Sequence, residues 1–177
     1  MAAAGIMLLS VAAAIVYGII HDQITARVCV EYFTVYHRPV FPTDDPTLLG
    51  LGWGIIATWW VGFILSIPLT LAARAGRRPK RRVLSLIKPI AILLLFMGGC
   101  ALMAGVAGFA AATSGGVTLA EPWAEKIPPH KHAAFIADLW AHTVSYLVGT
   151  AGGVVLCLQV WRAREYGFGK KYIGSRR

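Results

Sequence analysis

The sequence predicts an all-α fold, a membrane helical bundle of four transmembrane helices that forms one domain over residues 1–177. Of the 177 residues, 57% are hydrophobic and 14% are charged, whereas a soluble domain has about 25% charged residues. Apolar stretches recur at the length of about 20 residues that a helix needs to cross a bilayer. Most of the surface is therefore expected to contact lipid. The expected spans are residues 2–22, 47–73, 84–112 and 133–161, followed by a basic tail at 162–177.

The first span, residues 2–22, is longer than the apolar core of a cleaved signal peptide and has no basic residue at its start. It is expected to be a retained membrane helix. No Gly or Pro interrupts the chain between this span and Pro39, so we expect helix one to continue beyond the bilayer. The run 28–36 is also β-branched and aromatic, which favours a strand. In a continuous helix, Arg27 and Glu31 would pair one turn apart.

The second span has a clear helix start, because Asp45 suits the N-cap and Pro46 the first turn. Pro68 is expected to kink this helix. The third span contains glycines that favour close packing against neighbouring helices; they are Gly98, Gly99, Gly105 and Gly108.

The charges predict an orientation. Residues 74–88 contain seven Lys or Arg and no acid, and the tail contains six Lys or Arg and one Glu. The positive-inside rule then places both termini in the cytoplasm. The net charge of +9 does not indicate nucleic-acid binding, because the basic clusters adjoin apolar spans and no groove-reading motif accompanies them.

The histidines and carboxylates gather on the opposite side. All five histidines and seven of the eight carboxylates fall there. Asp138 and His142 are four residues apart in the fourth span and so share a helix face. At about 1.5 Å per residue, His21 and His142 should lie at the same depth, with Asp138 and Glu31 above them. Polar groups at membrane depth usually face the bundle interior and find partners there.

Three interpretations of this group remain open. In the first it is structural, with Asp138 accepting a hydrogen bond from His142 or Arg27. In the second it binds a transition metal such as Zn, Fe, Mn or Cu, for which imidazole and carboxylate are suitable ligands. The expected ligands are His21, Glu31, Asp138 and His142, with His37, His130 and His132 as alternates. In the third, His21 and His142 hold haem b; covalent attachment is excluded because no C-x-x-C-H motif is present.

Three segments, residues 21–27 (HDQITAR), 43–49 (TDDPTLL) and 73–79 (ARAGRRP), resemble small bacterial multi-pass membrane proteins without an assigned activity. The resemblance covers about the first half of the chain and implies a location in the bacterial inner (plasma) membrane.

The sequence favours a structural or accessory membrane component that contacts other membrane subunits or a second copy of itself. The alternatives are a membrane metalloenzyme or haem b redox protein, and an oligomeric small-solute transporter. Transport by four spans would require an oligomer, because one copy forms a thin pathway.

Overall fold

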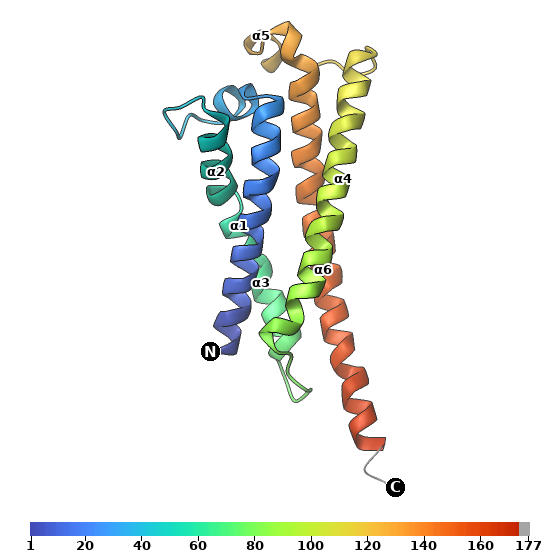
Figure 1. Cartoon of the computed structure of the whole chain (residues 1–177). Coiled ribbons are helices and arrows are strands. Elements are labelled where there is room, and N and C mark those ends of the chain that lie inside the picture. Colours follow the sequence, from blue (N-terminus) through green and yellow to red (C-terminus); the bar gives the residue numbers. More distant parts are fainter. Residues whose placement is uncertain (174–177) are drawn as a thin grey trace.

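The protein is a bundle of long helices, as seen in a computed structural model that describes residues 1–173 (Figure 1). Four segments are long and apolar enough to cross a membrane, and this part of the chain contains no β-strand. The spans are Ala2–Val28, Pro46–Arg74, Val83–Thr113 and Pro129–Arg164. The predicted all-α fold with four long apolar helices is confirmed.

Over residues 1–173, six α-helices and three short helical turns build these spans and the links between them. The α-helices are α1 (Ala2–Val28), α2 (Pro46–Ile56), α3 (Trp59–Arg74), α4 (Ile87–Thr113), α5 (Trp123–Lys126) and α6 (His132–Ile173). The turns are η1 (Tyr32–Tyr36), η2 (Val83–Leu86) and η3 (Pro129–Lys131).

The helices pack in two groups. Helix α1 lies against α2 and α3, α4 lies along α6, and α3 joins the groups through α6. The start of α1, the loop before η2 and the last turns of α6 lie at one end of the bundle, here called the η2 end (Figure 1). The opposite end carries η1 and α5 and is called the α5 end (Figure 1).

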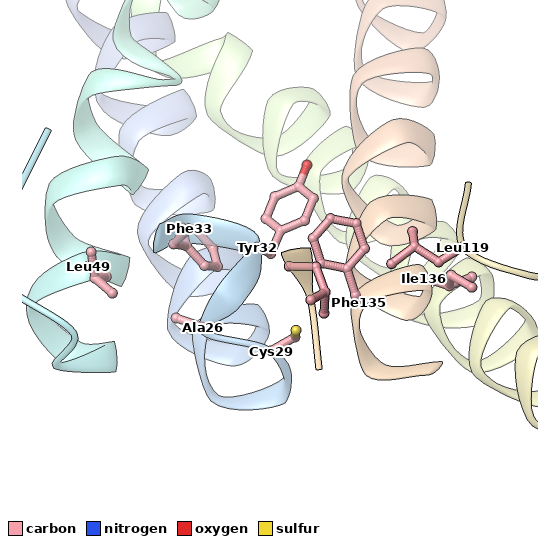
Figure 2. Packing of buried hydrophobic residues seen from close by; sticks show 9 residues of the cluster. Ala26, Cys29, Tyr32, Phe33, Leu49, Leu119, Phe135 and Ile136 are labelled. Carbon is pink, nitrogen blue, oxygen red and sulfur yellow. The ribbon is translucent and has the colours of Figure 1, made fainter. Parts of the chain in front are cut away.

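Helix α1 ends at Val28, so the prediction that it continues unbroken toward Pro39 is wrong. Cys29 is extended, with φ −150° and ψ 97°, and the chain then turns back as the π-helical segment η1. The physical reason is burial. The turn places Cys29, Tyr32 and Phe33, each no more than 5% exposed, in an apolar cluster that includes Phe135 of α6 (Figure 2). A straight helix would have left these apolar side chains outside the bundle.

The predicted pairing of Arg27 with Glu31 is also wrong, because the turn after Val28 separates the two side chains. Arg27 donates to the Gln23 carbonyl and side-chain oxygens and to Thr47 Oγ1, at 2.6, 2.8 and 2.8 Å. The bond to Thr47 ties the end of α1 to the start of α2.

The second span is broken, but not at Pro68, which lies inside α3. The break falls at Ala57 and Thr58, between α2 and α3. Thr58 Oγ1 donates to the Gly54 carbonyl at 2.5 Å, a backbone contact that bends helices. The predicted helix start is confirmed, since Asp45 Oδ1 accepts from the amides of residues 47 and 48, each at 2.9 Å.

Helix α6 continues to Ile173, twelve residues beyond the predicted end at residue 161. The last part of the predicted tail, residues 174–177, lies outside the described residues. Within α6, Arg164 is 1% exposed and donates to one backbone carbonyl in the last turn of α3 and to three in the loop that follows it. Arg164 therefore holds α6 against the end of α3 and the loop after it, at a position beyond the predicted end of the helix.

Candidate functional site

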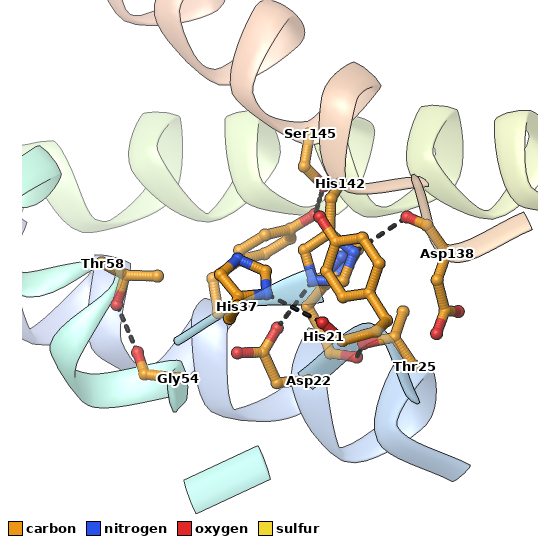
Figure 3. Close-up of polar contacts among 11 residues, drawn as sticks. His21, Asp22, Thr25, His37, Gly54, Thr58, Asp138, His142 and Ser145 are labelled. Atoms are coloured by element: carbon orange, nitrogen blue, oxygen red, sulfur yellow. Dashed lines mark hydrogen bonds and ion pairs between the residues drawn. The ribbon is translucent and has the colours of Figure 1, made fainter. Parts of the chain in front are cut away.

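Three potential metal ligands converge between α1 and α6 in the half of the bundle nearer the α5 end. They are His21 and Asp22 of α1 and His142 of α6, and their ligand atoms all lie within 4.8 Å of one another (Figure 3). His142 Nε2 lies 3.3 Å from Asp22 Oδ1. The His21 and His142 ring centroids are 4.5 Å apart, which confirms the prediction that these residues share a depth.

The orientation of His142 is fixed on both sides of its ring. Its Nδ1 lies 2.9 Å from the backbone carbonyl of Asp138, and because a carbonyl only accepts, Nδ1 is the donor. The Nε2 atom is thereby directed toward Asp22. Tyr32 of η1 stacks on the ring, with centroids 4.4 Å apart and planes at 27°. Metal-ligating histidines typically donate their second ring nitrogen in this way.

His21 and Asp22 lie in an environment with few other polar partners. Asp22 is 5% exposed. The Nε2 atom of His21 is buried and has no hydrogen-bond partner among residues 1–173, although Tyr17 stacks on the ring at 5.6 Å. Leaving a buried polar atom unsatisfied costs about 1–3 kcal/mol. A metal ion bound at this nitrogen would remove that cost.

His37 is the predicted alternate that reaches the same cavity. Its Nδ1 donates to the Tyr32 carbonyl at 2.8 Å, and its ring lies 4.7 Å from that of Trp53. Burial lowers the pKa of His37 below its ordinary value, so the imidazole is neutral near pH 7. A neutral imidazole that donates through Nδ1 keeps the Nε2 lone pair available to a ligand.

Two predicted ligands lie outside the group of three. Glu31 accepts a hydrogen bond from Cys29 Sγ at 3.3 Å. Burial and this bond raise the pKa of the Cys29 thiol to about 12, so the thiol stays protonated and is a poor ligand. Asp138 contributes its backbone carbonyl to His142, and its carboxylate is neither bonded to His142 nor to Arg27 in the described part of the chain. Asp138 therefore accepts a hydrogen bond from His142, as the structural interpretation expected, but it does so through its backbone carbonyl.

The remaining alternates lie at the α5 end. His132 Nε2 donates to the Ile127 carbonyl at 2.8 Å, and His130 belongs to η3. The residue that the sequence prediction missed is Asp22. One signal for it was present, because a carboxylate next to His21 at membrane depth is costly unless it has a partner.

A cavity of about 160 Å³ extends from these groups into the bundle. Its polar end is lined by His21, Asp22, His37 and His142, and its walls continue along α1, α3, α4 and α6 as far as Cys157. The His21 and His142 rings contact each other edge to face. No space is left between them for a porphyrin ring, so the arrangement does not fit haem b held by both histidines.

Two imidazoles and one carboxylate beside a cavity can bind a divalent transition metal and leave a coordination position for another molecule. Burial raises the pKa of the Tyr32 phenol above its ordinary value, so the ring that covers His142 carries no charge. No protein-family model, no curated protein and no solved structure matches this chain.

Proposed function

We propose that this membrane protein binds one divalent transition-metal ion through His21, Asp22 and His142. The observation that carries the proposal is the 3.3 Å separation of His142 Nε2 and Asp22 Oδ1. Tetrahedral zinc holds nitrogen and oxygen ligands at about 2.0–2.2 Å, which puts neighbouring ligand atoms about 3.3 Å apart. His21 supplies the third ligand, and its buried Nε2 has no hydrogen-bond partner in the described part of the chain.

The proposed centre is of the open kind. Three protein ligands are typical of catalytic zinc sites, whereas structural sites use four. The cavity adjoins the ligands on the side of His37 and Trp53, so an additional ligand can reach the metal there. These features favour a metal centre that acts on, or responds to, a bound molecule.

The proposed location is a bacterial inner membrane with both termini in the cytoplasm. Support comes from the basic residues around the loop of the η2 end, where Arg74, Arg78 and Arg81 lie near Arg164. Positive loops are retained on the cytoplasmic side. The metal ligands would then lie toward the outer leaflet.

A second candidate function is structural. When His142 is protonated, its contact with Asp22 is an ion pair that ties α1 to α6. The protein would then be an accessory membrane component without a metal. The two candidates differ in what the site binds, which a metal measurement decides.

The test is metal analysis of the detergent-purified protein, stripped with a chelator, reloaded with Zn²⁺ and desalted. One zinc ion per chain is expected for the wild type, and none for His142→Ala or Asp22→Asn. His132→Ala is the matched control, because this histidine bonds to Ile127 away from the site, and it should retain the metal. Unchanged zinc in His142→Ala, or no zinc in the folded wild type, would leave only the structural candidate.

A further inference from the structure

We propose that the cavity beside the metal ligands binds a long-chain carboxylic acid, with the carboxylate at the metal and the hydrocarbon chain along the bundle. This inference rests on the proposed metal centre and names the class of molecule that occupies its open side.

The cavity has the length and polarity of such a molecule. Its lining runs from His21 back to Ser10 on α1 and from His142 to Cys157 on α6. At about 1.5 Å per residue, these stretches span about 16 and 22 Å. The histidines and the Asp22 carboxylate occupy one end, and the walls beyond them are mainly apolar, with a few hydroxyl groups such as that of Ser10. The side chains that form these walls include Leu65, Leu69, Leu93, Leu94 and Leu156.

A route for a lipid-soluble ligand adjoins the cavity. A groove of about 440 Å³ is lined by residues of α1, α4 and α6, among them Asp138, and Tyr17 and His21 line both the groove and the cavity. The groove is bordered by apolar side chains on the lipid-facing surface, among them Ile20 and Val106, each 59% exposed. A molecule dissolved in the bilayer can therefore approach the metal ligands without entering water.

The charge of the centre selects a monoanionic head. A divalent ion and the Asp22 carboxylate together carry one net positive charge, and an uncompensated charge in apolar surroundings is costly. One carboxylate neutralises it and is itself a good ligand for the same metals. A neutral lipid head would leave the charge in place.

Small residues create the space for the chain. Gly153 of α6 lines the cavity, and a Cβ added there would meet the Leu65 side chain at 3.4 Å, an ordinary contact. The nearest neighbours of this Cβ are side-chain atoms and not backbone, so we expect a leucine at this position to be accommodated and to fill part of the cavity. Gly99 of α4 is a matched control, because a Cβ there meets nothing within 4 Å.

The experiment is photo-crosslinking with palmitic acid that carries a diazirine in its chain, added to zinc-loaded protein in phospholipid nanodiscs. Labelled residues are identified by peptide mass spectrometry. We expect labels on cavity residues such as Leu65 and Leu93. Excess palmitic acid should compete with this labelling and octanoic acid should not. This competition is measured on the wild-type protein, so it does not depend on the folding of a variant. Removing zinc with a chelator should lower cavity labelling by about tenfold, the loss expected when about 1.4 kcal/mol of binding free energy is removed.

The variants give the second readout. Gly153→Leu should abolish cavity labelling, and Gly99→Leu should leave it unchanged. Labels confined to lipid-facing residues such as Leu95 would overturn the inference. Cavity labelling that stays the same after zinc is removed would also overturn it. The zinc content is measured on the same samples. If zinc is bound but palmitic acid does not compete with cavity labelling, the proposed ligand is wrong and the metal centre is still supported. If no zinc is bound, both proposals are wrong.

Discussion

Arg164 offers the sharpest test of how the bundle is held together at the η2 end. Its side chain is 1% exposed. The guanidinium donates to the carbonyls of Ala72, Ala75, Arg78 and Pro79 at 2.7, 2.7, 3.0 and 2.8 Å. Hydrogen bonds from charged groups are worth about 1.5–3 kcal/mol each. Only the bond to Ala72 is fully buried, and water can replace the arginine at the other three carbonyls.

Counting the buried bond near the upper value and the other three at about 0.5 kcal/mol each, Arg164→Ala should lower the free energy of unfolding by about 4–5 kcal/mol. Arg164→Lys should recover about half of that loss, because an ammonium group cannot reach four carbonyls with the geometry of a guanidinium. The assay is equilibrium unfolding in mixed detergent micelles, followed by intrinsic fluorescence. Arg162→Ala is the matched control, since Arg162 is exposed on the same helix. Equal stability of the Arg164→Ala and Arg162→Ala proteins would refute the reasoning.

Two further predictions concern the other end of the bundle and the contact between α1 and α2. Because burial lowers the pKa of His37 below about 6.5, the unfolded chain gains a proton there before the folded chain does. The contribution of His37 to stability should therefore be full above about pH 6.5 and fall as the pH falls, and His37→Gln should make the fall in the thermal unfolding midpoint between about pH 7 and 5 less steep. Gly54→Ala should destabilise the bundle by about 1–3 kcal/mol or more, because its Cβ would lie 2.5 Å from the Ile19 backbone. Gly99→Ala, which meets nothing, should be neutral in the same unfolding titration, and equal values for the two glycine variants would contradict the packing argument.

The sequence predicted those features of the fold that depend on position along the chain. Apolar runs of sufficient length gave the four helices, and the side chains of Asp45 and Pro46 marked the start of α2. The common depth of His21 and His142 followed from the rise per residue in a helix. Each of these is a local or one-dimensional property, so no knowledge of the neighbouring helices was needed.

The ends and breaks of the helices were less predictable, because neighbouring helices decide them. Helix α1 ends at Val28 since the aromatic residues after it gain burial against α6. The break between α2 and α3 lies where the Thr58 side chain bonds to the Gly54 carbonyl. Pro68, which in the sequence is the stronger signal for a helix break, lies inside α3.

The sequence by itself determined that this chain is a helical membrane protein with two histidines at one depth. Only the tertiary structure decided which carboxylate joins them. Successive residues point about 100° apart around a helix with 3.6 residues per turn, and α1 is apolar nearly all round, so its sequence does not show which face meets α6. The packing turns Asp22 toward His142 and leaves Asp138 and Glu31 outside the group. The arrangement of the site is therefore a consequence of helix rotation, which is fixed by contacts between distant segments.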